Sequence, residues 1–284
     1  MKIKLGIIGL GLIGGSLAKS FKKNLENVTI VAYDRNEETL ITARNFGTVD
    51  IITNNIDYNF KDCDYIFLCT PIEFNIKFLK KLKSIIDLNC IITDVGSTKS
   101  NIHDIVIKEN LESQFIGGHP KAGSEKSGYE FSNSNLFKNS YYVITPTSRT
   151  NDIKLQEFKD LIIAIGAKPI IIKDYKKHDY AVAGISHVPH IIAIELVNLI
   201  NNTDDESNLM KLLASTGFKD TTRIANCSAE VWEQICMTNT NNIVDLLDVY
   251  INQLITIKEN IKNKNSEYVY QRFNNSSKYR KQIF

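Results

Sequence analysis

Six residues near the N-terminus constrain the fold more than any other part of the sequence. They are Gly9, Leu10, Gly11, Leu12, Ile13 and Gly14, a G-x-G-x-x-G run. The run directly follows an apolar segment at Ile3–Ile8 and opens a helical pattern at Ile13–Lys23. Glycines at these spacings allow a tight turn, let a pyrophosphate approach the backbone, and let the helix pack closely on the strand. The helix N-terminus adds amide donors, so the sequence predicts a dinucleotide site.

The residues that distinguish NAD from NADP follow the second apolar run, Val28–Tyr33. Asp34 follows that run and lies 20 residues after Gly14. A carboxylate there accepts the hydroxyl protons of an adenosine ribose and repels a 2′-phosphate. Arg35 is next and could bind such a phosphate, so the sequence favours NAD and leaves NADP as the alternative. Thr70 and Pro71 end a later strand at the same sheet edge, where we expect them to wall the cofactor pocket.

Apolar runs and helical patterns alternate through the first 173 residues. Strands are expected at Ile3–Ile8, Val28–Tyr33, Tyr65–Cys69, Cys90–Asp94, Gln114–Ile116, Tyr141–Thr145 and Lys168–Ile172. Helices are expected at Ile13–Lys23, Glu37–Phe46, Glu73–Ile86, Ser100–Glu109 and Asp152–Ile165. This alternation predicts an α/β fold with a Rossmann-type, doubly wound, mostly parallel sheet covered on both faces.

The pattern changes from Asp174 onward, where strand-like runs stop. Long helical stretches follow at Tyr175–Ile200, Ser207–Arg223 and Ala229–Lys262, and residues 264–284 read as a weakly packed helix or tail. We therefore expect two domains, a nucleotide-binding domain at 1–173 and an all-α substrate and dimerisation domain at 174–284. The apolar helices exceed what one small helical domain would bury, which predicts a homodimer formed through them.

Charge and cysteine content narrow the partners and the compartment. The net charge is +2 with signs mixed along the chain, so no strong field favours nucleic acid, and a small molecule is the expected partner. Five cysteines form no C-x-x-C pair, which fits a reducing compartment. Glycine and serine interrupt the apolar run Leu5–Ala18, and no other segment offers the ~18 uninterrupted apolar residues of a membrane span. We expect a cytoplasmic protein.

One histidine stands outside any periodic apolar face. The segment 117–128 reads GGHPKAGSEKSG and places His119 between a glycine pair and Pro120. Glycine and proline predict a tight loop, and the polar residues that follow surround His119 as a potential acid or base. An ordinary solvated turn is the alternative interpretation.

Two further segments offer candidate functional side chains. Ser97 follows a predicted strand and should face the crevice where open sheets bind ligands, although it could also simply cap a helix. The run Ser186–His190, SHVPH, places His187 and His190 three residues apart on a helix that contains Pro189. No third ligand lies nearby in sequence, so we expect no metal, and we expect His103 and His178 to be surface residues.

These motifs in their order resemble the prephenate dehydrogenase family. The resemblance rests on GLGLIGGS at 9–16, DVGSTKS at 94–100, GGHPKAGSEKSG at 117–128, SHVPH at 186–190, and the later pair Gly217 and Arg223. It implies an NAD-dependent oxidative decarboxylation of prephenate to 4-hydroxyphenylpyruvate in tyrosine biosynthesis. The histidine segment together with SHVPH is specific to this group, whereas many dehydrogenases share the glycine run.

The resemblance also assigns roles. His119 is implied as the acceptor of the ring hydroxyl proton, and Ser97 as the residue that orients that hydroxyl toward the cofactor. Arg223 and His190 are implied at the substrate. The resemblance further implies that the substrate site is lined by the polar or backbone positions Ser186, Ser124, Glu125 and Gly217.

Three alternatives remain open at this point. An arogenate dehydrogenase performs the same chemistry on a substrate that carries an amine, and these motifs barely separate the two. A dehydrogenase of another small hydroxy acid shares the two-domain plan but does not need both histidine segments. A non-catalytic NAD sensor needs the glycine run alone, so the joint presence of His119, Ser97 and Arg223 argues against it.

Overall fold

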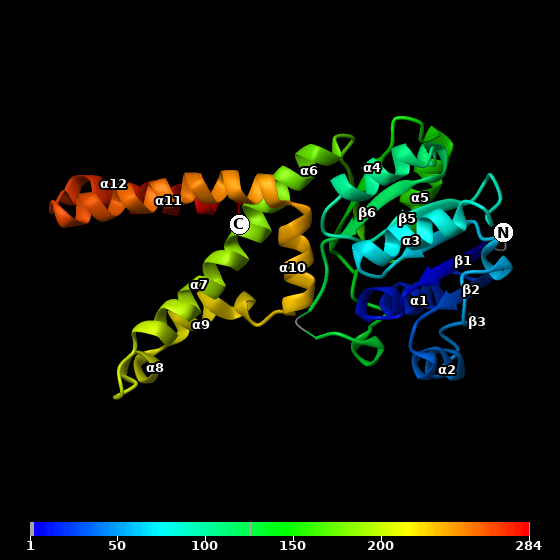
Figure 1. The fold of residues 1–284 in the computed structure, drawn as a ribbon, viewed down its shortest axis with the longest axis horizontal. Coiled ribbons are helices and arrows are strands. Elements are labelled where there is room, and N and C mark those ends of the chain that lie inside the picture. The colour runs from blue at the N-terminus through cyan, green and yellow to red at the C-terminus, as the bar shows by residue number, and fades with distance from the viewer. Residues whose placement is uncertain (1–2, 125, 284) are drawn as a thin grey trace.

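The computed structural model describes residues 3–124 and 126–283 and shows a sheet half joined to a helical half (Figure 1). The sheet half holds the N-terminal strands, and the helical half extends from it as two diverging arms. One arm contains α7, α8 and α9, and the other contains α11 and α12.

Five parallel strands form the main sheet in the order β3-β2-β1-β4-β5. They are β1 (Ile3–Ile8), β2 (Val28–Tyr33), β3 (Ile51–Thr53), β4 (Tyr65–Leu68) and β5 (Ile91–Asp94). Ile8 lies opposite both Tyr33 and Leu68, so β1, β2 and β4 end at the same level. The segments that follow these strands therefore meet at one edge of the sheet, where open α/β sheets bind ligands.

Helices cover both faces of this sheet. They are α1 (Leu12–Asn24), α2 (Glu37–Asn45), α3 (Ile72–Leu82), α4 (Ser100–Lys108) and α5 (Asp152–Ala164). Phe21 of α1 and Phe158 of α5 belong to one buried core, while Leu79 of α3 and Val106 of α4 belong to a second. The predicted Rossmann-type, doubly wound fold is thus confirmed. The three-residue strand β3 was not expected, because its apolar run is too short to stand out.

A second sheet contains β6 (Ile116–Pro120), β7 (Tyr141–Pro146) and β8 (Lys168–Ile171). Strand β7 pairs antiparallel with β6 and parallel with β8, and one bridge between Ile92 and Phe115 joins the two sheets. The expected strand at 114–116 was therefore placed too early, and His119 lies within a strand rather than in a loop.

The glycine pair before His119 serves packing and not a turn. A Cβ on Gly117 would stand 2.2 Å from the Thr145 hydroxyl oxygen, and one on Gly118 would stand 2.6 Å from the Asp94 carbonyl oxygen. Such distances are far below van der Waals contact, so only glycine fits here. Close packing therefore explains the two glycines, which in the sequence alone had indicated a tight loop.

The helical half consists of α6 (Tyr175–Val182), a π-helical turn (Ala183–His187), α7 (Val188–Thr203), α8 (Leu209–Leu213), α9 (Thr216–Thr222), α10 (Ala229–Thr238), α11 (Thr240–Lys262) and α12 (Ser266–Ile283). The first three elements run on continuously. Pro189 lies in the first turn of α7, directly after the π turn, where its missing N–H is tolerated. The predicted helical stretch at 229–262 is divided at Asn239.

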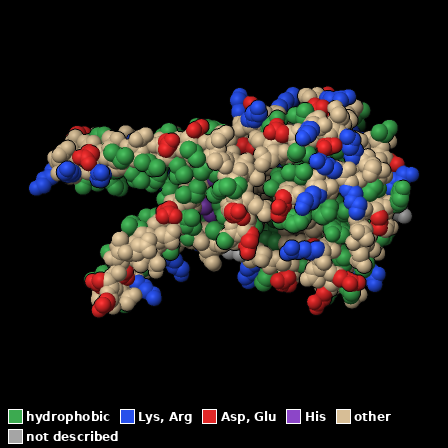
Figure 2. Space-filling model, in the orientation of Figure 1, with side chains coloured by type: hydrophobic (Ala, Val, Ile, Leu, Met, Phe, Trp, Pro, Cys, Tyr) green, Lys and Arg blue, Asp and Glu red, His purple; other side chains and the backbone are tan. Residues whose placement is uncertain are grey.

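Apolar side chains remain exposed along both arms. Figure 2 shows hydrophobic side chains along the α11–α12 arm and where the two arms meet. Leu212 and Leu213 are 78% and 69% exposed, and Leu254 on α11 is 47% exposed. Within the described residues, the helix Tyr175–Thr203 is long and apolar enough to cross a membrane by length and composition, with a mean hydropathy of 1.4 over its most apolar window.

Candidate active site

The glycine run forms a cradle at the end of β1. Gly9 has φ +98°, a conformation that favours glycine, and a Cβ on Gly14 would stand 1.9 Å from the Gly9 carbonyl oxygen. Apart from Gly11 and its two chain neighbours, no atom of residues 3–124 and 126–283 lies within 4 Å of the position that a Cβ on Gly11 would occupy. The cradle is therefore closed beneath Gly14 and open above Gly11, as backbone recognition of a pyrophosphate requires.

Asp34 lies beside this cradle, half-buried. Its carboxylate accepts the N–H of Leu10 at 2.6 Å and that of Asn36 at 2.8 Å. A carboxylate has about four acceptor positions, so two remain for ligand hydroxyls. Arg35 is exposed next to it.

Thr70 and Pro71 lie on the other side of the cradle. The Thr70 methyl group would be 2.7 Å from a Cβ on Gly9, and its hydroxyl donates to Asn75 Oδ1 at 2.6 Å. Asn75 is buried on α3 and fixes the orientation of Thr70. The sequence pattern gave no indication of Asn75, because its role depends on a contact across a turn.

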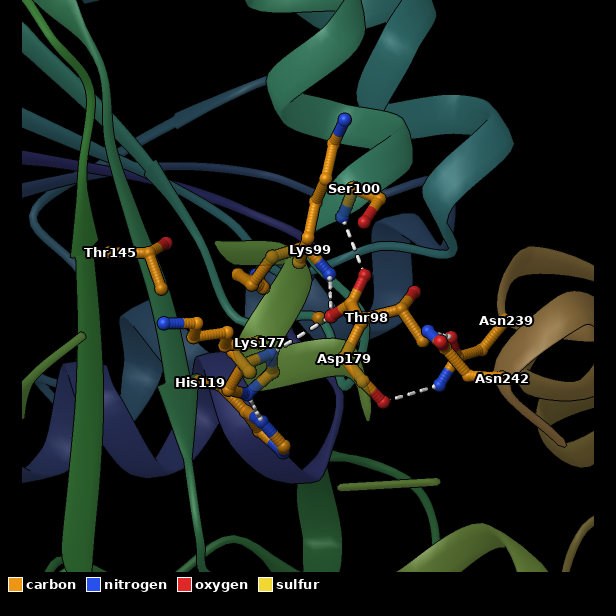
Figure 3. Close-up of polar contacts among 12 residues, drawn as sticks. Thr98, Lys99, Ser100, His119, Thr145, Lys177, Asp179, Asn239 and Asn242 are labelled. Carbon is orange, nitrogen blue, oxygen red and sulfur yellow. Dashed lines mark hydrogen bonds and ion pairs between the residues drawn. The ribbon is translucent and has the colours of Figure 1, made fainter. Parts of the chain in front are cut away.

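His119 is 6% exposed and contacts the helical half. Its Nδ1 lies 2.9 Å from Nε2 of His178, and Nδ1 of His178 lies 2.8 Å from Oδ1 of Asp179 (Figure 3). His178 was expected at the surface and is instead 1% exposed. The expectation was wrong because burial comes from tertiary packing of α6 against β6, which a short polar helix start does not reveal. The sequence feature that could have indicated the buried role of His178 is the adjacent His-Asp pair just after the change to a helical pattern.

Asp179 joins the two halves of the molecule. Its carboxylate accepts the backbone N–H groups of Lys99 at 2.8 Å and Ser100 at 2.7 Å, at the start of α4, and its carbonyl accepts from Asn239 Nδ2 at 2.8 Å. Burial opposes its ionisation, but hydrogen bonds from His178, Ser100 and Lys99 outweigh burial and lower the pKa of the carboxyl. Asp179 is therefore an ionised acceptor at neutral pH.

The electrostatic surroundings keep the His119 ring neutral. Burial lowers the pKa of His119 well below its ordinary value, and the positive charge of Lys121 and then the neighbouring His178 lower it further. A neutral imidazole carries one proton and one free lone pair. His119 can therefore accept a proton across the neutral pH range.

A buried ion pair supports the strand that carries His119. Lys99 and Asp94 are both fully buried and paired, and Lys99 Nζ also donates to the Gly118 carbonyl at 2.6 Å. Asp94 accepts the Gly118 N–H at 3.2 Å. Both backbone groups of Gly118 are thus fixed immediately before His119. Breaking a buried pair of this kind leaves an uncompensated charge, so the arrangement resists displacement.

Ser97 lies between β5 and α4, half-buried. Its hydroxyl has no hydrogen-bond partner within residues 3–124 and 126–283 and does not cap α4, whose N-cap residue is Lys99. The neighbouring Thr98 hydroxyl lies 3.0 Å from that of Thr238 on α10. This segment therefore contacts the helical half and leaves Ser97 able to bond to a ligand.

His190 and Ser186 lie where the two arms diverge. His190 Nδ1 donates to the Ser186 carbonyl at 2.8 Å, and the His190 ring stacks on Trp232 with centroids 3.8 Å apart. Burial lowers the pKa of His190, the Ser186 carbonyl opposes that shift, and the charge of Arg223 lowers it further. Trp232 is a site neighbour that the sequence did not indicate, since a lone tryptophan usually indicates core packing.

The other histidines have structural contacts. His187 is buried, and its Nδ1 accepts from Asn239 at 3.2 Å. His103 was expected at the surface but is 1% exposed. Its Nε2 lies 2.9 Å from the Thr145 hydroxyl, and its ring stacks on Tyr175. This expectation failed because α4 packs against the second sheet.

The remaining predicted substrate residues are more dispersed. Arg223 is exposed in a short 3₁₀ turn, and Ser124 is exposed in the segment after β6. Gly217 lies on α9 in an apolar pocket with Met210 and Phe218. Glu125 lies outside the described residues. Among the described residues, no group of three or more His, Cys, Asp or Glu side chains could hold a metal ion.

Known proteins resemble this chain over almost its whole length. The family model described as prephenate dehydrogenase, nucleotide-binding domain, matches residues 17–171, and the model described as prephenate dehydrogenase, dimerization domain, matches residues 174–275. The prephenate dehydrogenase of Bacillus subtilis is 34% identical over 283 residues, which cover 99% of this chain and 76% of that protein.

Solved structures also resemble this chain over almost its whole length. Prephenate dehydrogenase from Aquifex aeolicus, in complex with hydroxyphenyl propionate and NAD+, superposes with a TM-score of 0.92 at 30% identity, covering 100% of this chain and 99% of that one. Synechocystis arogenate dehydrogenase superposes with a TM-score of 0.88 at 30% identity, covering 99% and 100%.

Proposed function

Because the chain belongs to the prephenate dehydrogenase family, we propose that it oxidises and decarboxylates prephenate to 4-hydroxyphenylpyruvate with NAD, and that His119 accepts the proton of the ring hydroxyl. The observation that supports this most strongly is the hydrogen-bonded series His119–His178–Asp179. It places a neutral, oriented imidazole beside the edge of a nucleotide-binding sheet.

The hydrogen-bonded series supports Nε2 as the nitrogen of His119 that acts as the base. Ionised Asp179 can only accept, so Nδ1 of His178 carries a proton. In the His119–His178 hydrogen bond we assign the acceptor role to Nε2 of His178 and the donor role to the Nδ1–H of His119. Nε2 of His119 is left unprotonated and can take the proton of a substrate hydroxyl. Asp179 stabilises the positive charge that develops on the imidazoles, as an orienting carboxylate does behind a catalytic histidine.

The chain's own residues fit the nucleotide. Gly11 leaves room for the pyrophosphate, the N-terminus of α1 supplies amide donors, and Asp34 retains acceptor capacity for the ribose hydroxyls. Asp34 disfavours a 2′-phosphate, which supports NAD over NADP. When bound, the nicotinamide supplies the hydride acceptor. The binding site of the dinucleotide is lined by Leu10, Leu12, Ile13, Thr70 and Pro71.

We assign orientation of the substrate to side chains from both halves. Ser97 bonds to the ring hydroxyl and aligns it with His119, which contributes through proximity. Arg223 binds a carboxylate through its planar guanidinium, and His190 lies beside it. The further substrate contacts in the proposal are Ser186, Ser124, Glu125 and Gly217.

The helical half serves both substrate binding and dimerisation in this proposal, with the domain boundary near Lys173. A second copy packed against the two arms would bury their apolar side chains, including those of the helix Tyr175–Thr203. The enzyme is then a soluble cytoplasmic homodimer. Its biosynthetic relatives support solubility.

Arogenate is the competing substrate, and the similarity to an arogenate dehydrogenase at 30% identity favours keeping it in the test. The test follows absorbance of the reduced cofactor with purified protein, NAD or NADP, and prephenate or arogenate. The proposal predicts the highest kcat/KM for prephenate with NAD. Higher kcat/KM with arogenate would move the assignment to that substrate, and no turnover with either would refute it.

A further inference from the structure

Lys121 follows β6 directly and continues its pairing with β7. Its N–H donates to the Tyr141 carbonyl at 2.8 Å, so the pairing with β7 reaches this residue, at which the chain then bends. Residues two apart on a strand project from the same face, with Cα atoms about 6.6 Å apart. Lys121 therefore projects on the same side as His119, toward the helical half.

The positive charge of Lys121 acts on three histidines at the junction of the two halves, His119, His187 and His190. After burial, its charge is the largest cause of the lowered pKa of His119, and also of His187, whose pKa is about 4. The same charge acts on His190. Desolvation lowers the pKa of Lys121 itself, although the side chain is open to solvent. The Lys121 side chain is therefore partly enclosed by protein and still accessible to a ligand.

No carboxylate of the described residues pairs with Lys121. Asp179, the acid behind the histidines, is occupied by His178 and by the N–H groups of Lys99 and Ser100. A partly desolvated cation without a counter-ion is costly, so a site with this charge distribution favours an anionic ligand.

We propose that Lys121 is a substrate-binding residue that pairs with the side-chain carboxylate of the substrate; this rests on the proposed function. The reacting hydroxyl and the carbon that bears the side chain lie at opposite ends of the six-membered ring. His119 and Lys121 project from the same face of the strand with Cα atoms about 6.6 Å apart, so each can face one of these two ends. The departing carboxylate is the less suitable partner, because a salt bridge to it would stabilise the ground state against decarboxylation.

Lys121 also affects the ionisation of the base. The groups that face His119 are Lys121 after β6, His178 on α6, His187 in the π turn and Lys99 before α4, with Asp179 behind His178. Removal of the Lys121 charge raises the pKa of His119, so the acidic limb of kcat/KM moves to higher pH.

The test compares Lys121→Met and Lys121→Arg with the matched control Lys126→Met, an exposed lysine of the same segment that stacks over Phe131. A charge-assisted contact implies that Lys121→Met raises KM for prephenate about 10- to 100-fold, with KM for NAD unchanged. The inhibition constant of 4-hydroxyphenylpyruvate, which retains the side-chain carboxylate, rises in parallel. Lys121→Arg recovers most of the affinity, and Lys126→Met matches the wild type.

The outcomes separate this inference from the proposed function. Wild-type turnover of prephenate with unchanged KM and product inhibition in Lys121→Met would overturn the role of Lys121 alone. A raised KM with unchanged product inhibition would overturn the assignment to the side-chain carboxylate. Absence of wild-type turnover would end both proposals. Histidine NMR provides a readout that does not depend on turnover, since Lys121→Met raises the pKa of His119 if the charge acts as described.

Discussion

The two halves of the molecule differ in how much of their apolar surface is buried. In the sheet half, helices cover both faces of the sheet and enclose two buried cores. In the helical half, few apolar side chains are buried, among them Val182, Ala193 and Ile243, while many on the arms are exposed. The sheet half therefore completes its core within one chain, whereas the helical half, which matches a dimerization-domain model, leaves apolar surface exposed. The candidate active site lies where the two meet.

The largest expected effect comes from the residue at that junction. His119→Asn removes the proton acceptor while it preserves polarity and approximate size. We expect kcat to fall about 10²- to 10⁴-fold, with NAD affinity unchanged because the glycine cradle is intact. Turnover and NAD titration measure the two quantities separately. Turnover close to wild type would exclude His119 as the base.

A second substitution tests whether a partner chain covers the helical half. Leu254→Asp places a charge on an exposed apolar position of α11, which should raise the dimer dissociation constant about 100-fold or more if a second copy covers it. Light scattering after size exclusion measures the mass, and Lys258→Gln on the same helix is the control. A wild-type monomer at micromolar concentration would contradict the homodimer.

Asp179→Asn weakens the connection between the halves without removing the base. An amide keeps the size of the carboxylate but lacks its charge, and its NH2 end cannot accept from Ser100 or Lys99. We expect kcat to fall about 10²-fold and the melting temperature to decrease, because buried donors lose their acceptor. Unchanged kcat and melting temperature together would show that Asp179 serves neither purpose.

The smallest expected effect is a pH dependence of stability. Burial lowers the pKa of His103 to about 3 and that of His187 to about 4, and it also lowers that of His119. Between roughly pH 6.5 and pH 4 the unfolded chain binds protons that the folded chain excludes, so stability falls as pH falls. Thermal melting from pH 7 to pH 4 should show this decrease, and His103→Gln should make it shallower. An unchanged slope in that variant would contradict the lowered pKa of His103.

The sequence predicted the two halves unequally, for physical reasons. The glycine run, Asp34 and the alternation of strands and helices impose backbone requirements that a sequence displays directly, so the sheet half was expected nearly as observed. The partners of His119 are not local, since His178 lies 59 residues further along the chain. A buried histidine and an exposed one look alike in a sequence, which is why His103 and His178 were misplaced.

The glycine pair before His119 illustrates the same limit. Glycine fits a tight turn and also fits a strand with no room for a Cβ, and only the contacts with Thr145 and Asp94 decide between them. Stacking of His190 on Trp232 was likewise hidden, because the two residues are brought together by packing of separate helices.

The central claim is that His119 and Asp179 act as one unit across the two halves. A double-mutant cycle in kcat tests it most directly, with wild type, His119→Asn, Asp179→Asn and the double variant assayed at saturating prephenate and NAD. We predict that Asp179→Asn costs little further once His119 is replaced, so the double variant resembles His119→Asn. Two independent, multiplicative losses would contradict the account.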